Sequence, residues 1–522
     1  MRTELVVVGA GPAGLAAALA ADARGVRVTV VDAADGPGGQ FYRQPAAELN
    51  ARRPQALHHQ WRTWGRLRGG LAASGVRLLT GHHVWTVTGG PDSFTVHALF
   101  GPGQDEPATV HADAVLLATG SHEHVLPFPG WTLPGVVTAG GAQAMLKGGL
   151  VVPGRVAVVA GTGPLLLPVA TGLAAAGTRV SALVESAGPR QVARHARALA
   201  GKLPEGAGYA ARLLRHRVRP LARHTVVRAH GDDRLTGVTF AALDADGHVR
   251  RGTGRYLPCD TLAVGHGLLP QTDLAEGLGC HLDGPAVTVD AEQRTSAPGV
   301  WAAGEATGVG GAALALAEGH IAGRSAAARL RGTEPDPAGW APAARTREAL
   351  RTAAAALDAA FAPPAHWAAQ VTDDTVVCRC EEVTAGAVRE AADGLGAGDV
   401  RTVKLLTRAG MGWCQGRMCA TAVAALTGCH SVPPRRPLAR PVPLGILAGT
   451  APDRAAPDRA APDRAAPDRA APDRSVSGRP VSESDRSPSE QASTGGLSSD
   501  RPPHGRLSRD QNPPEALEEG SP

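Results

Sequence analysis

A glycine-rich turn near the N-terminus constrains the fold of this 522-residue chain more than any other feature. Gly9, Gly11 and Gly14 are spaced as G-x-G-x-x-G between the apolar run Leu5–Val8 and an Ala/Leu-rich stretch, residues 14–23, that is typical of a helix. The first glycine permits a tight turn, the second lets the backbone approach a pyrophosphate, and the third allows close packing of helix against strand. This order of elements predicts a parallel α/β dinucleotide-binding domain.

The next strand adds a carboxylate to the predicted nucleotide site. Val26–Val31 is expected to be a second strand, and Asp32 follows it, 18 residues after Gly14. A carboxylate there can accept a hydrogen bond from a ribose hydroxyl, while the preceding helix N-terminus offers free N–H groups to the phosphates. The residues predicted to hold the dinucleotide are Gly9, Gly11, Pro12, Ala13, Gly14 and Asp32.

The same order of elements recurs about 150 residues later, in residues 156–160, 165–176 and 178–184. Two such units predict an α/β fold with two nested Rossmann-like dinucleotide-binding domains. The flavoprotein-type region is expected to span residues 1–330, with the second nucleotide domain, about residues 150–265, inserted in the first.

The second glycine turn is degenerate. Gly161 and Gly163 keep the first two glycines, but Leu166 stands at the third position. A leucine there should push the helix away from the strand and distort the pyrophosphate cradle. Glu185 still ends the next strand, where it suits a ribose 2′-hydroxyl and disfavours a 2′-phosphate. NAD(P) is therefore one alternative for this site, beside another adenine nucleotide or no ligand.

Two later turns complete a resemblance to a known group of enzymes. Residues 115–120 form an apolar strand ending in Ala-Thr-Gly, and residues 299–305 end in Gly-Glu. These segments resemble the two-dinucleotide-domain flavoprotein reductases, in which Ala-Thr-Gly and Gly-Asp segments flank bound FAD. The resemblance implies FAD as cofactor, with Glu305 where Asp is commoner. It implies the further flavin contacts Gly39, Gln40, Thr119, Gly120, Gly304 and Glu305.

The chemistry beside this flavin is restricted by what the chain lacks. No cysteine precedes Cys259, which excludes the dithiol chemistry of disulfide reductases. His122 and His124 follow the Ala-Thr-Gly turn, and we expect them to be exposed rather than catalytic. No catalytic residue is assigned.

Four of the seven cysteines fall in two close pairs, Cys378/Cys380 and Cys414/Cys419. Four thiolates in two pairs can bind zinc or a [2Fe–2S] cluster, and the C-x-C spacing favours the cluster. Cys414 is expected to begin a helix, residues 415–426. The remaining cysteines are interpreted as buried small hydrophobic residues: Cys259, Cys280 and Cys429.

The cysteine segment resembles the bacterioferritin-associated-ferredoxin (BFD)-like [2Fe–2S] module, which we expect at residues 371–430. Over residues 1–448 the order of motifs resembles the A (alpha) subunits of opine oxidases, hydroxyproline dehydrogenases and the hydrogen-cyanide-synthase type. The most similar segment is residues 126–143, LPFPGWTLPGVVTAGGAQ.

This resemblance implies an FAD-dependent oxidoreductase subunit that relays electrons between flavin and cluster. Its expected partner is a separate FAD-containing beta subunit that oxidises the C–N bond of an amino acid or opine, with a small gamma subunit as a further partner. The electron acceptor stays open. The alternatives are a self-sufficient NAD(P)H-dependent reductase that serves a protein acceptor, and a redox-sensing interaction protein.

The rest of the chain predicts no further catalytic unit. Residues 331–370 are Ala/Arg-rich with Pro breaks and are expected to be a helical connector. Residues 446–522 contain Ala-Pro-Asp-Arg-Ala repeats and no aromatic residue, which predicts a disordered tail. The net charge of +5 is too dilute for a nucleic-acid surface. No apolar run is long enough for a membrane span, so a cytoplasmic protein is expected.

Overall fold

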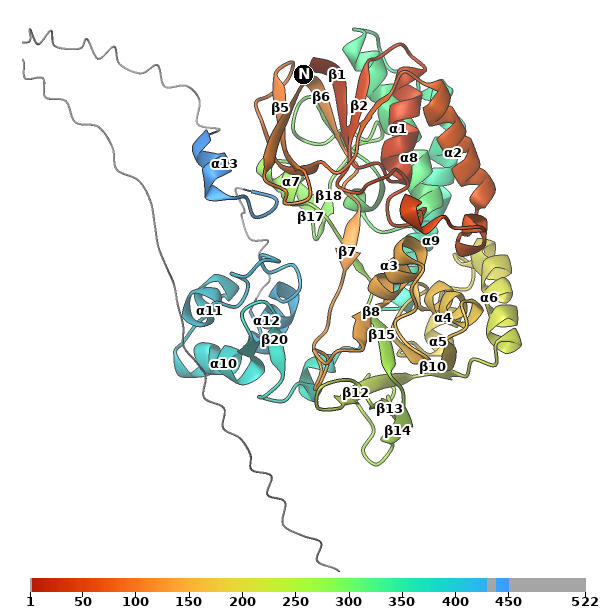
Figure 1. Ribbon diagram of the computed structural model, residues 1–522, viewed down its shortest axis with the longest axis vertical. Helices are drawn as coiled ribbons and strands as arrows, with labels where there is room; N and C mark the ends of the chain where they lie inside the picture. The colour runs from red at the N-terminus through yellow and green to blue at the C-terminus, as the bar shows by residue number, and fades with distance from the viewer. Residues whose placement is uncertain (1, 430–437, 450–522) are drawn as a thin grey trace, which may run out of the picture. The chain divides into compact units, whose positions relative to one another are not determined.

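The computed structural model describes residues 2–429 and 438–449, which belong to one compact unit. Within them, the first nucleotide domain is built on a seven-stranded sheet (Figure 1). Its strands lie in the order β3 (Arg77–Leu79), β2 (Val28–Val31), β1 (Arg2–Val8), β6 (Glu106–Leu117), β5 (Phe94–Phe100) and β4 (His83–Thr88), with β19 (Val300–Ala302) beside β6.

The long strand β6 joins two kinds of pairing in this sheet. Its first half pairs with β5 in antiparallel fashion, and its second half lies between β1 and β19, both parallel to it. β1 also pairs with β2 in parallel. The parallel part is buried on both sides, which explains why its strands are continuous runs of Val, Leu and Ala rather than alternating patterns.

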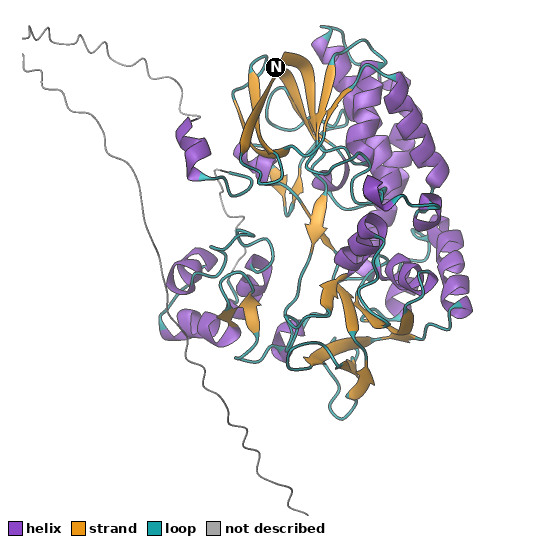
Figure 2. Ribbon diagram, viewed as in Figure 1, coloured by secondary structure: helices purple, strands orange, loops and turns teal. Residues whose placement is uncertain are grey.

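Helices cover one side of this sheet, as Figures 1 and 2 show. They include α1 (Pro12–Asp22), α2 (Trp61–Ala73) and α8 (Ala312–Leu330). α8 packs closely against α1 because two glycines face the α1 backbone. A Cβ atom on Gly319 or Gly323 would lie 2.1 Å or 2.2 Å from the carbonyl oxygens of Ala13 and Ala17.

The second nucleotide domain has its own parallel sheet with helices packed against it. In spatial order its strands are β11 (Pro220–Ala222), β10 (Arg179–Glu185), β9 (Val156–Gly161), β15 (Thr261–Gly265) and β8 (Val136–Thr138). Its helices are α3 (Ala139–Gly149), α4 (Leu166–Ala175), α5 (Pro189–Arg194) and α6 (Leu203–Arg215). A separate antiparallel sheet is formed by β12 (His224–His230), β13 (Gly237–Ala242) and β14 (Arg255–Pro258).

The chain enters and leaves the second domain through two adjacent strands. β7 (Ser121–Glu123) and β16 (Leu268–Pro270) pair antiparallel and connect the two larger sheets (Figure 1). After β16 the chain forms α7 (Asp273–Gly277) and the hairpin β17 (Leu282–Asp283) and β18 (Ala286–Val287). The predicted pair of nested Rossmann-like domains is therefore confirmed.

A helical module with its own core follows the nucleotide domains. The predicted connector contains α9 (Ala341–Ala360). The module consists of β20 (Val376–Cys378), β21 (Val383–Thr384), α10 (Ala385–Arg389), a π-helical turn (Glu390–Gly394), α11 (Val400–Thr407) and α12 (Ala420–Thr427). Cys378 and Cys419 lie inside its apolar core, which also contains Val388 and Val403.

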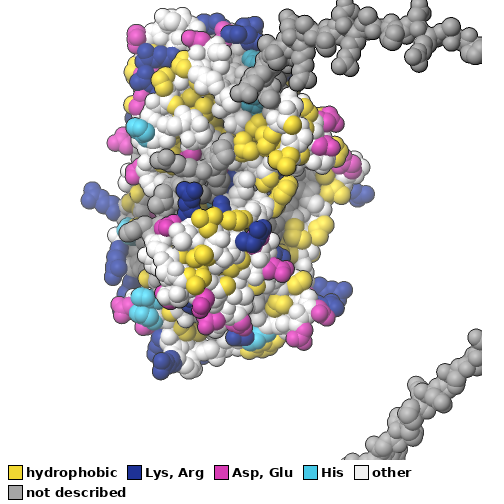
Figure 3. Space-filling view, turned by 90° about the vertical axis from the view of Figure 1, so that its left-hand side faces the viewer, with side chains coloured by type: hydrophobic (Ala, Val, Ile, Leu, Met, Phe, Trp, Pro, Cys, Tyr) yellow, Lys and Arg dark blue, Asp and Glu magenta, His cyan; other side chains and the backbone are white. Residues whose placement is uncertain are grey.

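The end of the chain is described only in part. α13 (Leu444–Gly449) includes the first four residues of the predicted tail, and the rest of that prediction, residues 450–522, lies outside the described residues. In the part of the chain that is described, no helix has the length and apolar character needed to cross a membrane. On the face in Figure 3, Lys and Arg side chains are interspersed with Asp and Glu, so this face carries no patch of one charge.

Candidate FAD and iron–sulfur sites

Three turns of the first domain leave its sheet at the same edge. Val8, Leu117 and Ala302 lie in register on β1, β6 and β19, so the chain leaves these parallel strands side by side. The turns that follow, residues 9–14 and 118–120 and the segment from 303 to 305, contain most of the predicted site residues. Ligands of parallel sheets bind outside the carboxyl ends of the strands, so this edge is the candidate dinucleotide site.

The glycine turn has the close contacts that a pyrophosphate cradle requires. Gly9 has φ +108°, and a Cβ atom there would lie 2.3 Å from the carbonyl oxygen of Ala118. A Cβ on Gly14 would lie 1.8 Å from the carbonyl oxygen of Gly9. α1 begins at Pro12, and no side chain caps its N-terminus within the described chain. The N–H groups of its first turn can therefore bind a phosphate.

Asp32 supports this turn from the end of β2. Its carboxylate accepts hydrogen bonds from the backbone N–H groups of Ala10 and, at 2.7 Å, Ala34. Burial raises the pKa of the Asp32 carboxyl, and these two N–H groups act in the opposite direction. The carboxylate is thus held where β2 meets the glycine turn, as its predicted contact with a ribose requires.

Gly39 and Gln40 approach the turn from the following loop. Gly39 has φ +59°, and a Cβ atom on it would lie 2.8 Å from the Cα of Gly11. The Gln40 side-chain oxygen accepts a hydrogen bond from Arg43 at 2.8 Å, which fixes its direction. A glycine at position 39 is therefore needed for this close approach, whereas a Cβ on Gly11 would lie 4.0 Å from the Gly39 Cα, an ordinary contact.

The other two turns contact the same region. Gly304 has φ +77°, and a Cβ on it would lie 2.7 Å from the Cβ of Ala13 on α1. Glu305 accepts a hydrogen bond from the Ser121 hydroxyl, directly after the Ala-Thr-Gly turn. The structure therefore brings all the predicted residues of the first site to one edge of the sheet.

The second glycine turn keeps the positive φ of its first glycine, but the helix after it begins later than in the first site. Gly161 has φ +129°, and its Cβ would lie 1.8 Å from the carbonyl oxygen of Gly265. α4 begins only at Leu166, five residues after the first glycine, whereas α1 begins three residues after its own. The Leu166 side chain is 1% exposed, and it packs in the core beside Gly265, where a Cβ atom would lie 3.6 Å from it. The helix N-terminus is therefore displaced from the turn.

Glu185 repeats the role of Asp32 in this second site. Its carboxylate accepts hydrogen bonds from the N–H groups of Gly163 at 3.1 Å and Ala187 at 2.9 Å. Burial raises the pKa of the Glu185 carboxyl to about 7, against the lowering effect of these hydrogen bonds. Near neutral pH the side chain is therefore only partly ionised.

The four paired cysteines form one interacting group in the helical module. The Cys414 thiol interacts with those of Cys419 and Cys380, and Cys419 also interacts with Cys378. Cys380 and Cys378 also interact, so the four thiols form one group. No three metal-binding side chains in the described residues converge on a single-ion site. A Cβ on Gly412 would lie 2.2 Å from the Cβ of Cys380, so a glycine is needed where this loop passes the first pair.

The helix start in this module differs from the prediction. Cys419, not Cys414, is the N-cap residue of the helix, because residues 412–419 form turns and α12 begins at Ala420. Hydrogen bonding from Cys419, with the N–H groups of Met418 and Gly416, lowers the pKa of the Cys414 thiol to about 5. Donation to Cys414, together with burial, raises the pKa of Cys419. One thiol of the group, that of Cys414, is thus readily available as a thiolate.

Two kinds of comparison identify the domains and the relatives. Residues 3–327 match the pyridine nucleotide-disulphide oxidoreductase family, and residues 376–427 match the BFD-like [2Fe-2S] binding domain. The HcnB subunit of hydrogen cyanide synthase from Pseudomonas aeruginosa is 34% identical over 465 residues, 84% of this chain and 96% of that protein. The A (alpha) subunit of opine oxidase from Agrobacterium tumefaciens is 33% identical over 445 residues, 81% of this chain and 85% of that protein.

The chain belongs to the family of HcnB and the A (alpha) subunits of opine oxidases. Its fold is also that of L-proline dehydrogenase from P. horikoshii, with a TM-score of 0.60 at 19% identity over 86% of this chain and 79% of that one. As a member of this family the chain is an oxidoreductase with FAD and a [2Fe–2S] cluster as its cofactors. This settles the choice between cluster and zinc, and between an enzyme and a purely sensory protein.

The residues present in this family member fit both cofactors. A Cβ atom on Gly120 would meet nothing within 4 Å and one on Gly11 only the Gly39 Cα at 4.0 Å, so the space beside these two glycines is open to a ligand, and the uncapped N-terminus of α1 follows Gly11. Four thiols in one group, one with a lowered pKa, are the donor set of a [2Fe–2S] cluster. The individual ligand assignments remain predictions.

A buried ion pair beneath the Gly304 turn was not predicted from the sequence. Glu318 of α8 is 1% exposed and accepts hydrogen bonds from the Gly304 N–H at 2.9 Å and from Nε of Arg351 at 2.8 Å. Arg351 also donates to the Thr307 hydroxyl at 2.7 Å. Burial raises the pKa of the Glu318 carboxyl, and Arg351 opposes this. The sequence feature that could have indicated this pair is the single glutamate, Glu318, in the Ala-rich segment 312–330.

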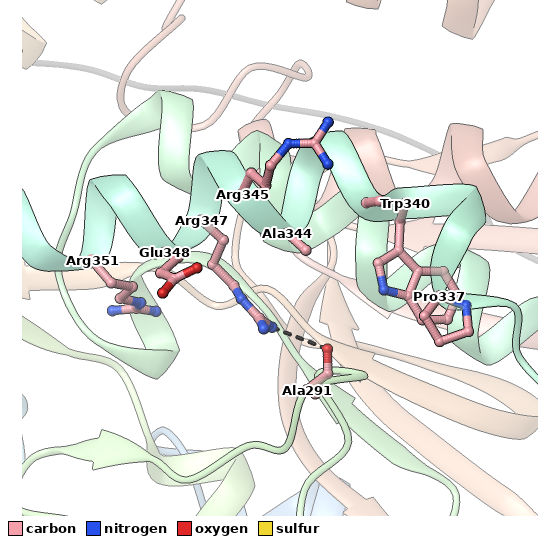
Figure 4. A pocket seen from close by; sticks show the side chains of 9 residues that line it. Ala291, Pro337, Trp340, Ala344, Arg345, Arg347, Glu348 and Arg351 are labelled. Atoms are coloured by element: carbon pink, nitrogen blue, oxygen red, sulfur yellow. Dashed lines mark hydrogen bonds between the residues drawn. The ribbon is translucent and has the colours of Figure 1, made fainter.

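Arg351 also lies at one end of an open cavity of about 540 Å³ (Figure 4). The cavity is lined largely by α9, and Arg347 there donates hydrogen bonds to the Ala291 carbonyl and the Gln293 side chain. Arg347 and Arg351 therefore tie α9 to the first domain. The predicted connector is thus part of the support of the flavin site.

Other expectations were met only in part. Cys259 and Cys280 are buried as predicted, and burial raises the pKa of Cys259 to about 12. Cys429 is only half-buried. The expectation that His122 and His124 are exposed was wrong, because both are half-buried: His122 lies on β7 opposite Leu269 of β16, and His124 follows that strand.

Proposed function

We propose that this family member is the electron-relay subunit of a heteromeric dehydrogenase that oxidises the C–N bond of an amino acid or opine. Electrons would pass between its FAD and its [2Fe–2S] cluster and on to a one-electron acceptor outside the chain. One observation carries the proposal: a complete flavin cradle and a four-thiol group lie in one compact unit, and no cysteine precedes Cys259. The flavin therefore has the cluster, and no dithiol, as its outlet in this chain.

Each predicted residue has a defined task in this relay. The turn of Gly9, Gly11 and Gly14 would hold the pyrophosphate with α1, and Asp32 would hold the adenosine ribose. Thr119, Gly120, Gly304 and Glu305 would border the ribityl chain, and Gly39 and Gln40 would cover the middle of the cofactor. The cluster ligands would be Cys378, Cys380, Cys414 and Cys419. When bound, FAD can release its electron pair singly, which suits a one-electron cluster.

A second subunit would carry the substrate chemistry. The relatives from Pseudomonas aeruginosa and Agrobacterium tumefaciens are both named as subunits, and this chain spans nearly their whole length. The sequence assigns no acid–base group to the flavin edge. We therefore propose a separate beta subunit with its own FAD, and a small gamma subunit, as partners. Co-purification of the native complex tests this: a second polypeptide with its own flavin is expected, and a relay chain that purifies without one would be the contrary result.

The second candidate function is a self-sufficient NAD(P)H-dependent reductase. It is favoured by two features of the second site. Gly161 has a positive φ, and Glu185 accepts a hydrogen bond from the N–H of Gly163 in the turn, as Asp32 does from the N–H of Ala10 in the first site. It is disfavoured by Leu166 and by the late start of α4. Anaerobic addition of NADH to the purified chain separates the two functions. The relay proposal expects the flavin absorbance to persist, and rapid bleaching would support the reductase instead.

A further inference from the structure

Each pair of cluster cysteines has a polar contact with the flavoprotein region. The first contact is made by Trp131, which is 6% exposed in the core of the second nucleotide domain. Its indole N–H donates to the carbonyl oxygen of Val376 at 2.6 Å, two residues before Cys378. Trp131 belongs to the family-like segment 126–143, for which the relay chemistry alone gave no role.

The second contact is an ion pair at the other cysteine pair. Arg417 lies between Cys414 and Cys419, and its Nε and one terminal nitrogen donate to the same carboxylate oxygen of Asp273 at 3.2 Å and 3.0 Å. The two side chains are 17% and 6% exposed. The other terminal nitrogen of Arg417 donates to the carbonyl oxygen of Cys414 at 3.2 Å. Arg417 therefore holds the cysteine loop and the flavoprotein region together.

Asp273 is attached to the predicted flavin edge through a single short loop. Two residues before it, Gln271 donates its N–H to the carbonyl oxygen of Gly120 at 2.9 Å and accepts from the Thr119 hydroxyl at 2.6 Å. The Gln271 side chain also donates to the Asp273 carboxylate. Hydrogen bonds thus link the Ala-Thr-Gly turn, through Gln271 and Asp273, to Arg417 in the cysteine loop.

We propose that Asp273 and Arg417 are positioning residues that dock the cysteine loop on the flavin-side turn and thereby set the rate of electron transfer from flavin to cluster. This rests on the proposed function. In the step concerned, one electron passes from the two-electron-reduced flavin to the oxidised cluster, and then to a one-electron acceptor outside the chain. The second electron follows by the same route, and the protons of the reduced flavin go to solvent. Neither residue takes part in the chemistry.

The ion pair is suited to this role because it is largely shielded from water. An exposed pair contributes little, whereas removing one partner of a buried pair leaves the other charge uncompensated. Loss of either partner should therefore loosen the loop rather than leave it in place. Arg408 provides a matched control, because it pairs with Glu381 at 2.8 Å inside the module and its own side chain is largely exposed.

The test uses the full-length holoprotein and four variants: Arg417→Gln, Asp273→Asn, the double variant and the control Arg408→Gln. The flavin is photoreduced anaerobically, and reduction of the cluster is followed by absorbance and low-temperature electron paramagnetic resonance. Iron and flavin contents are measured in parallel, and hydrogen exchange is followed at residues 118–121, 271–273 and 414–419. Asp273→Asn is the decisive single variant, because Asp273 lies outside the cysteine loop.

We expect each single variant to slow cluster reduction by about tenfold, and the double variant to be no slower than either, because the pair acts as one unit. Hydrogen exchange should rise in the linked segments, while iron and flavin contents stay as in the wild type. Arg408→Gln should match the wild-type rate. A wild-type rate in Asp273→Asn would overturn the proposal, even where Arg417→Gln loses its cluster. Additive slowing in the double variant would overturn it too. If the wild type itself transfers no electron, the proposed function fails instead.

Discussion

The second nucleotide site can be tested through the ionisation of its buried carboxyl. Burial raises the pKa of Glu185 from an ordinary value of 4.5 to about 7. The folded protein therefore holds this proton more tightly than the unfolded chain does. The stability that the protonated carboxyl contributes is complete below the unfolded pKa and is lost as the pH rises through 7. At about 1.4 kcal/mol per pKa unit, the loss reaches about 3 kcal/mol above pH 8.

The variant to compare is Glu185→Gln, which keeps the shape of the side chain and cannot ionise. Relative to the wild type, its free energy of unfolding should rise by about 2 kcal/mol between about pH 5.5 and pH 8. Urea unfolding of both proteins at several pH values measures this difference, provided that both have the same dependence on urea. Glu48→Gln, at an exposed position, should show no such trend. Parallel pH curves for wild type and Glu185→Gln would show that this carboxyl does not bind its proton more tightly in the folded protein.

Three further substitutions test the packing of the two nucleotide sites. Gly14→Ala should yield protein with little FAD, because the added Cβ atom would clash with the carbonyl oxygen of Gly9 in the glycine turn. Gly65→Ala, where an added Cβ meets nothing within 4 Å, should keep full flavin absorbance. Equal flavin contents in the two variants would show that the glycine turn is not needed to bind FAD. Arg351→Ala should lower the free energy of unfolding by about 3–5 kcal/mol and weaken FAD retention, since it strands a buried carboxylate. Arg345→Ala, on the same helix, should leave both nearly unchanged, and similar losses in the two variants would argue against the ion pair. Leu166→Ala should lower the free energy of unfolding by about 2–5 kcal/mol in chemical denaturation, because this leucine side chain is buried in the core. A decrease below about 1 kcal/mol would show that the Leu166 side chain is not tightly packed.

The first site was predictable because its backbone leaves little choice of residue. Gly9 and Gly14 approach neighbouring carbonyl oxygens so closely that no Cβ atom fits, and such positions leave a readable spacing in the sequence. Val8 and Leu117, which lie in register, each end an apolar run that the sequence already showed. The same logic located the four cysteines, since close thiol pairs are uncommon without a metal or a redox role.

The contacts that tie the domains together could not be read in this way. Trp131 and Val376 are 245 residues apart, and Glu318 meets Arg351 across 33 residues from a different helix. Nothing in the local sequence of either partner identifies the other. The start of α12 was also missed, because Gly416, with φ +83°, prolongs the turn after Cys414 and leaves Cys419 as the cap.

The proposed relay requires that flavin and cluster exchange electrons within this one chain. The most direct measurement is photoreduction of the flavin in the anaerobic wild-type holoprotein, without any mediator, followed by the paramagnetic signal of the reduced cluster. The relay predicts that this signal appears as the flavin loses an electron, and that complete reduction takes up about three electrons per chain, two at the flavin and one at the cluster. A cluster that stays oxidised beside a fully reduced flavin until a mediator is added would contradict it.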